Sequence, residues 1–142
     1  ACAKVGMNMV CACPKGYQPD LVIFREACEE AKKTGCTIEI EEDLFEAAKG
    51  ADVLYTDVWA SMGQEGEQSI RKEALGDYQI NAELLKVARP DAIVLHCLPA
   101  HRGEEITEEV IEGPHSVVFD QAENRLHVQK AIMALLMSDE KI

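Results

Sequence analysis

Apolar and polar residues follow one another along the chain in a pattern that predicts strands alternating with helices. Short apolar runs predict strands, and apolar residues at helical spacing predict helices, of which 20–34 is the clearest. The predicted strands cover residues 9–13, 37–41, 53–58, 93–95 and 117–119, and helices are predicted at 1–4, 20–34, 43–49, 81–88, from 107 and from 122. This alternation predicts an α/β domain with a doubly wound parallel sheet and helices on both faces.

Residues that favour helix ends support these boundaries. Side chains that can cap a first turn precede four of the predicted helices, at Asp20, Asp43, Asn81 and Thr107. Glycines that can end a helix follow two of them, at Gly35 and Gly50. The chain has no internal repeat or linker, so its 142 residues are interpreted as one domain.

Three predicted strands end in chemically unusual groups. Asp57 ends one strand, Cys97 follows the next, and Arg125 lies beyond the last. Because the carboxyl ends of parallel strands open on one edge of the sheet, these residues can converge on one cleft. With Ser61 and the amide of Met62 close behind it, Asp57 offers an acceptor for an ammonium group and donors for a carboxylate. That combination suits an amino acid.

The second of these strand ends, which Cys97 follows, runs into a turn that contains a proline. Pro99 fixes its own backbone and is expected to hold Leu98 extended, which leaves the carbonyl groups of Cys97 and Leu98 free to accept hydrogen bonds. A rigid turn with free acceptors and a thiol suits a small polar ligand.

Each of these residues also has a purely structural interpretation. Cys97 could be a small buried apolar residue, and Asp57 could cap a loop. Arg125, in the first turn of the predicted last helix, would lose about 1 kcal/mol to the helix dipole, so a carbonyl or anionic group is expected beside it. In the structural interpretation, Asp120 or Glu123 neutralises it.

Composition narrows the possible partners. A net charge of −12 argues against nucleic acid and anionic membranes as partners and favours a cationic small molecule. No stretch is apolar enough to span a bilayer or to act as a secretion signal. The six cysteines form no C-x-x-C pair, which favours free thiols in a reducing, cytoplasmic setting over a disulfide framework.

Metal and nucleotide chemistry have little support in the sequence. His96, Cys97 and His101 form only a loose ligand set, because neighbours on an extended backbone point to opposite faces. The chain has no Gly-rich phosphate loop and no G-x-S-x-G motif. We therefore predict no metal and no cofactor.

The end of the chain predicts a helix with an unusual surface. Residues 131–136 are apolar on every side of that helix, so another domain or subunit is expected to cover them. The alternative is an apolar helix end that frays in solution.

Taken together, these segments resemble the carboxy-terminal, amino-acid-binding half of a transcarbamoylase, and most closely the members that act on ornithine. The resemblance runs along nearly the whole chain, through 15–19, 51–65, 96–103 and 121–127. Asp57 with Ser61-Met62-Gly63, and the turn His96-Cys97-Leu98-Pro99, are highly specific when they occur together. Members that act on aspartate have a turn resembling His-Pro-Leu-Pro, so the cysteine points to ornithine.

The resemblance implies a role for each site residue. Asp57, Ser61 and Met62 would hold the α-amino and α-carboxylate groups of ornithine. Cys97 would lie beside the δ-amine, its carbonyl and that of Leu98 would bind the carbamoyl NH2, and Arg125 would bind carbamoyl phosphate and polarise its carbonyl. Asp57, Cys97 and Arg125 would therefore be the catalytic residues.

The chain also departs from the family pattern. The Ser-Thr-Arg-Thr and His-Pro-x-Gln segments of the first domain are missing, as is the Gly-Asp-x-Asn-Asn strand turn. Residues 1–142 are therefore expected to form an ornithine-binding domain with a Rossmann-like sheet that lacks its first strand. The amino-terminal carbamoyl-phosphate domain is absent, so the chain should be inactive alone. The family further implies a homotrimer or larger assembly.

Two other functions stay open from the sequence. One is a carbamoyltransferase for another amine such as putrescine. Putrescine has no α-carboxylate for Ser61 and Met62 to bind. The other is a non-catalytic α/β module that binds a ligand.

Overall fold

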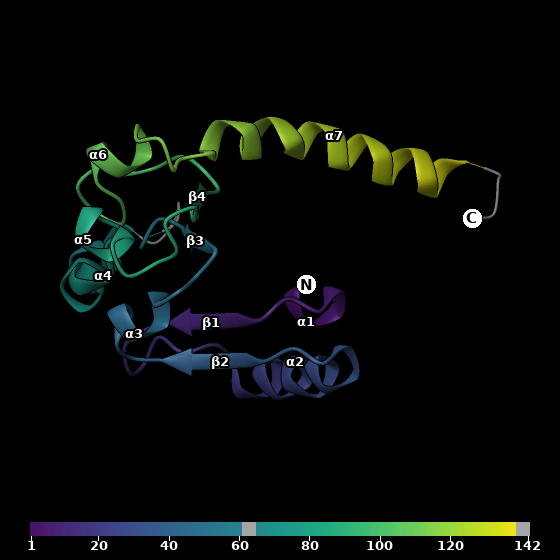
Figure 1. The fold of residues 1–142 in the computed structure, drawn as a ribbon, viewed down its shortest axis with the longest axis horizontal. Helices are drawn as coiled ribbons and strands as arrows, with labels where there is room; N and C mark the ends of the chain where they lie inside the picture. The colour runs from purple at the N-terminus through teal and green to yellow at the C-terminus, as the bar shows by residue number, and fades with distance from the viewer. Residues whose placement is uncertain (61–64, 139–142) are drawn as a thin grey trace.

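Two separate pairs of parallel strands form the framework of the chain (Figure 1). The computed structural model describes residues 1–60 and 65–138, in which β1 (Met9–Ala12) pairs with β2 (Ile38–Glu41) and β3 (Val53–Thr56) pairs with β4 (Ile93–His96). Within these residues no strand joins β1 to β3. The predicted parallel pairing is confirmed, and the division into two pairs agrees with a sheet that lacks one strand.

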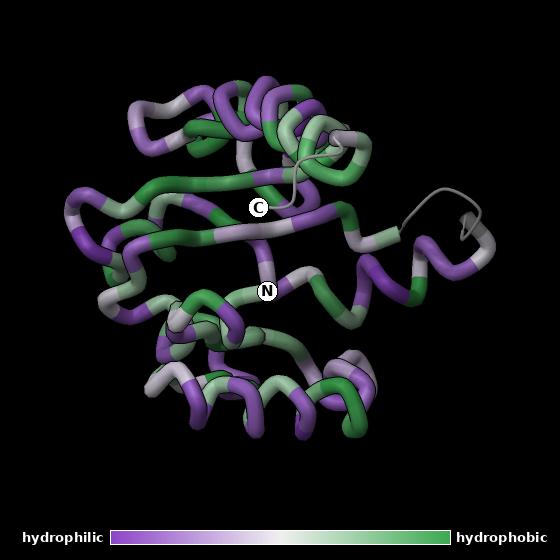
Figure 2. Tube along the Cα trace, turned by 90° about the vertical axis from the view of Figure 1, so that its right-hand side faces the viewer, coloured by the Kyte–Doolittle hydropathy of each residue, from purple (hydrophilic) through white to green (hydrophobic). Residues whose placement is uncertain are grey.

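Helices connect and flank these strands. The α-helices are α1 (Cys2–Val5), α2 (Leu21–Thr34), α3 (Leu44–Ala48), α4 (Gln68–Leu75), α5 (Ala82–Leu85), α6 (Glu108–Ile111) and α7 (Val118–Met137). Two 3-10 helices, η1 (Glu65–Glu67) and η2 (Gly76–Tyr78), flank α4. Figure 2 shows hydrophilic and hydrophobic residues alternating along α2, the lowest helix in both views, as expected for a helix with one face toward the strands.

Capping bonds explain where several helices begin. The Asp20 carboxylate accepts hydrogen bonds from Val22 N at 2.9 Å and Ile23 N at 3.1 Å, and Asp43 and Asn81 cap α3 and α5 in the same way. These three caps are confirmed. Thr107 precedes α6 as predicted, but its side chain makes no capping bond.

The core lies around β3 and β4. Val94, Ile106 and Val118 are completely buried, and the cluster that they form includes Leu54 and Leu84. The β1–β2 pair is less covered, since Met9 and Val10 keep 43% and 42% of their surface exposed. The second strand pair is therefore the firm base from which site residues project.

The predicted strand at 117–119 is wrong. Only Ser116 forms a bridge to Val94, and Val117 N donates to the Val94 carbonyl at 3.0 Å before α7 begins at Val118. A short β-branched run does not distinguish a strand from the buried first turn of a helix. Burial of Val118 against the core decides in favour of the helix.

The last helix extends away from the rest of the molecule (Figure 1). Beyond the buried Val118, its apolar side chains are exposed, among them Phe119 at 62%, Leu126 at 58% and Leu136 at 81%. The prediction of a helix that is apolar all round is confirmed, and the predicted cover over 131–136 stays a prediction. None of the described helices combines the length and the apolar character needed to cross a bilayer.

Candidate active site

The turn that follows β4 has an unusual backbone. Leu98 has a φ of 53°, in the left-handed region that bulky residues rarely adopt, and the peptide bond between Leu98 and Pro99 is cis. The expectation that Leu98 is extended is therefore wrong. Leu98 N donates to His96 Nδ1 at 2.8 Å, and this bond holds the residue in its strained conformation.

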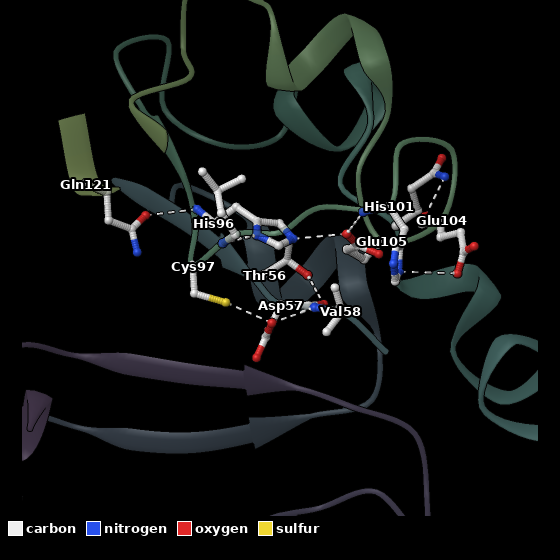
Figure 3. Close-up of polar contacts among 11 residues, drawn as sticks. Thr56, Asp57, Val58, His96, Cys97, His101, Glu104, Glu105 and Gln121 are labelled. Carbon is white, nitrogen blue, oxygen red and sulfur yellow. Dashed lines mark hydrogen bonds and ion pairs between the residues drawn. The ribbon is translucent and has the colours of Figure 1, made fainter. Parts of the chain in front are cut away.

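His96 is a buried support for the turn (Figure 3). Because its Nδ1 accepts from Leu98, the ring proton lies on Nε2, which donates to Glu105 Oε1 at 3.0 Å. The same Glu105 oxygen accepts from His101 N at 2.6 Å. Both ring nitrogens of His96 have protein partners, so this histidine cannot also be a metal ligand.

The thiol of Cys97 and the carboxylate of Asp57 meet beside this turn. Cys97 Sγ donates to Asp57 Oδ1 at 2.8 Å, and Val58 N donates to the same oxygen at 2.7 Å. Burial, followed by the hydrogen bond to Asp57 and its negative charge, raises the pKa of the Cys97 thiol to about 11. The thiol is thus protonated at neutral pH.

Arg125 reaches the turn from α7. Its Nη1 donates to the Cys97 carbonyl oxygen at 3.4 Å. Since α7 begins at Val118 rather than Ala122, Arg125 lies inside the helix, and the prediction that it stands in the first turn is wrong. Within the described residues Arg125 makes no ion pair with Asp120 or Glu123, and Glu123 instead bonds His127 at 3.2 Å.

The structure therefore brings Asp57, Cys97 and Arg125 to one edge of the β3–β4 pair. Leu98 lies in the same turn and is half-buried. Ser61 and Met62, the other predicted contacts for ornithine, lie outside the described residues. A half-buried thiol bonded to an exposed carboxylate, beside a guanidinium, can orient an amine, accept its proton and stabilise charge on a carbonyl oxygen.

Two supporting residues were not predicted. Glu105 holds His96 from inside the core, and Gln121 on α7 accepts from His96 N at 2.9 Å (Figure 3). Neither stands in a sequence pattern that reveals its partner. The only available signal is that Gln121 precedes Arg125 by four residues and so lies on the same side of a helix.

One group of possible metal ligands occurs within the described ranges. Atoms of His101, Glu104 and Glu105 lie within 4.8 Å of one another. Glu104 already pairs with Lys72 at 2.6 Å, and Glu105 accepts from His96. We interpret these side chains as supports of the loop.

Comparison with known proteins identifies the family. The model for the aspartate/ornithine carbamoyltransferase Asp/Orn binding domain matches residues 1–136. The chain belongs to the aspartate/ornithine carbamoyltransferase family. The match covers every site residue discussed above.

Relatives within this family are similar along almost the whole chain. Ornithine carbamoyltransferase from Gloeobacter violaceus is 59% identical over 136 residues, which are 96% of this chain and 44% of that protein. The Thermococcus kodakarensis protein of the same name is 55% identical, over 98% of this chain and 44% of its own length. The chain thus spans less than half of each relative.

Solved carbamoyltransferase structures confirm the α/β, Rossmann-like fold. Ornithine carbamoyltransferase from Pyrococcus furiosus superposes with a TM-score of 0.91 at 51% identity, over 98% of this chain and 44% of that one. An acetylornithine transcarbamylase complexed with acetylcitrulline superposes with a TM-score of 0.83 at 30% identity, over 97% of this chain and 42% of that one.

Proposed function

We propose that the protein carrying this chain transfers the carbamoyl group of carbamoyl phosphate to the δ-amine of L-ornithine, giving citrulline and phosphate. This chain supplies the ornithine half of the active site. The observation that carries the proposal is the 2.8 Å contact between Cys97 and Asp57, with Arg125 on the Cys97 carbonyl. The proposal is also supported by sequence, because this chain is 55–59% identical to two proteins named ornithine carbamoyltransferase.

The first chemical requirement is an uncharged amine. An alkyl amine has a pKa of roughly 10.4, so removing its proton costs about 4–5 kcal/mol near neutral pH. Asp57 is the acceptor suited to this step, because its carboxylate already accepts the Cys97 thiol proton in a hydrogen bond. The thiol of Cys97 would then position the δ-nitrogen rather than remove its proton.

The second requirement is stabilisation of the tetrahedral intermediate. The δ-nitrogen forms a bond to the carbamoyl carbon, and the bond from that carbon to the phosphate oxygen breaks, so that phosphate leaves. The carbonyl groups of Cys97 and Leu98 would accept from the carbamoyl NH2. Arg125 would stabilise negative charge on the carbamoyl oxygen. No cofactor or metal takes part in this scheme.

The remaining contacts would select the substrate. Ser61 and Met62, together with Asp57, would hold the α-amino and α-carboxylate groups of ornithine. Putrescine has no α-carboxylate and would not make these contacts with Ser61 and Met62. A comparative titration of ornithine and putrescine separates these two amines.

We further propose that residues 1–142 are an ornithine-binding domain whose partner is the amino-terminal carbamoyl-phosphate domain of the same enzyme. The exposed apolar surface of α7 and the share of each relative that the chain spans support this proposal. The assembled enzyme would be a homotrimer or larger. Six free cysteines fit a reducing cytoplasm.

Citrulline formation by the full-length protein tests the proposed function. Cys97→Ser and Arg125→Ala should each reduce the rate strongly, because one removes the group beside the amine and the other removes the cation. Cys28→Ser is the matched control, since Cys28 contacts the Ile38 carbonyl on the other strand pair. Citrulline formation that survives both site substitutions unchanged would favour the non-catalytic module instead.

A further inference from the structure

Two side chains on one face of α7 hold neighbouring backbone groups at the end of β4. Gln121 Oε1 accepts from His96 N at 2.9 Å, and Arg125 Nη1 donates to the Cys97 carbonyl oxygen at 3.4 Å. Gln121 and Arg125 are four residues apart, so both point from the same side of the helix. The position of one side chain therefore constrains the position of the other.

Gln121 continues the hydrogen bonding of the single bridge that Ser116 forms with Val94 on β4. On this edge of β4, Val94 N donates to the His115 carbonyl at 2.8 Å, and Val117 N donates to the Val94 carbonyl at 3.0 Å. The next donor on the edge is His96 N, but the chain has by then turned into α7. The Gln121 side chain supplies the acceptor that a longer strand would have supplied.

Gln121 is also the last attachment of α7 before Arg125. Val118 is buried and Gln121 is half-buried, whereas every described residue from 122 to 138 is exposed. Gln121 Nε2 makes a second bond, to Tyr55 Oη on β3 at 3.3 Å. Arg125 thus stands one turn beyond the point where the helix is fixed to the strands.

We propose that Gln121 is a positioning residue that sets the distance of the Arg125 guanidinium from the Cys97 carbonyl, through its bond to His96 N. This inference rests on the proposed function, in which Arg125 binds carbamoyl phosphate. Loss of the acceptor leaves the N–H of the buried His96 without a partner and frees the first turns of α7. A shift of about 1 Å at a group that contacts the transition state can cost a hundredfold in rate.

Steady-state kinetics of the full-length protein test the proposal. Gln121→Met keeps the length of the side chain but removes the acceptor, so kcat/KM for carbamoyl phosphate should fall roughly tenfold or more, with little change in KM for ornithine. Gln121→Glu keeps an oxygen for His96 N and should retain most of the parent activity. Tyr55→Phe removes only the weaker bond to Gln121 and should behave as the parent protein.

Hydrogen exchange provides a readout that does not depend on turnover. Gln121→Met should speed exchange of the amides in the first turns of α7, whereas Gln121→Glu should not. If the parent protein is active and Gln121→Met keeps the parent kcat/KM, this inference is overturned while the proposed function stands. The same holds if Gln121→Glu or Tyr55→Phe loses as much activity as Gln121→Met. A parent protein that forms no citrulline would overturn the proposed function, and this inference with it.

Discussion

The thiol of Cys97 and the carboxylate of Asp57 are 40 residues apart in sequence and lie 2.8 Å apart in the structure. They meet because β3 and β4 are neighbouring parallel strands, with Thr56 paired to His96, so the residues that follow them leave the same edge side by side. The hydrogen bond that the Cys97 thiol donates to Asp57 determines how each group can act.

We predict that Asp57→Asn lowers the pKa of the Cys97 thiol. The carboxylate contributes two of the causes that raise it to about 11, its hydrogen bond and its charge. The rate of iodoacetamide alkylation at Cys97, followed by peptide mass spectrometry across pH, measures this pKa. In the parent protein alkylation should rise only as pH approaches about 11, and in the variant it should rise earlier.

The control for this measurement is Asp77→Asn, which neutralises an aspartate on η2 outside the site. An unchanged Cys97 profile in Asp57→Asn would mean that burial alone sets the pKa of the thiol.

Stability should fall in alkaline solution partly because of Cys97. Its folded pKa, about 11, exceeds the ordinary value of 9.0, so between these values the folded state binds more protons than the unfolded state. The contribution of the thiol to stability is therefore complete below pH 9.0 and is lost as pH rises toward about 11. Cys97→Ala should make the fall in the free energy of unfolding between pH 9.0 and about 11 smaller. Urea unfolding at these two pH values measures this difference.

A second thiol should behave in the same way. Burial and the neighbouring Cys11 raise the pKa of Cys13 to about 11, so Cys13→Ala should also make the alkaline decline shallower. Because the two cysteines lie on different strand pairs, their effects should add. If neither substitution changes the slope, other groups cause the alkaline loss.

Features that depend on local interactions could be predicted from the sequence. Asp20 and Gly35 mark the ends of α2 because a cap and a left-handed glycine act within one turn. The meeting of Asp57 with Cys97 could be predicted because parallel strands share an edge. Neither inference needs the identity of a distant partner.

Where sequence reasoning failed, tertiary contacts decided the outcome. A helix, not a strand, begins at Val118 because Val118 is buried against the core, and Arg125 therefore lies beyond the first turn. Glu105 looks like one more acidic residue in a polar loop until the structure places it beneath His96. Its burial could not be inferred, since its neighbour Glu104 has the same side chain and stays partly exposed.

These two adjacent glutamates should respond differently to substitution. Glu105→Ala leaves the buried Nε2–H of His96 without an acceptor and also removes the acceptor of His101 N, at a cost of about 3 kcal/mol in the free energy of unfolding. Glu104→Ala removes a partly exposed ion pair with Lys72, which is worth about 1 kcal/mol at most. Urea unfolding of the two variants compares the costs directly, and equal values would show that Glu105 is not the main support of the turn.

Arg125→Lys tests whether the shape of the cation matters as well as its charge. A lysine keeps the positive charge, but its ammonium cannot present two planar donors to a carbonyl and a neighbouring oxygen at once. If Arg125 stabilises the carbamoyl oxygen in the transition state, kcat should fall by about a hundredfold, with KM for ornithine nearly unchanged. Arg89→Lys serves as the control, because Arg89 pairs with Asp52 and Asp91 away from the site and should lose no activity. A rise in KM for carbamoyl phosphate with kcat intact would instead assign Arg125 to ground-state binding, since uniform binding lowers KM without accelerating the chemical step.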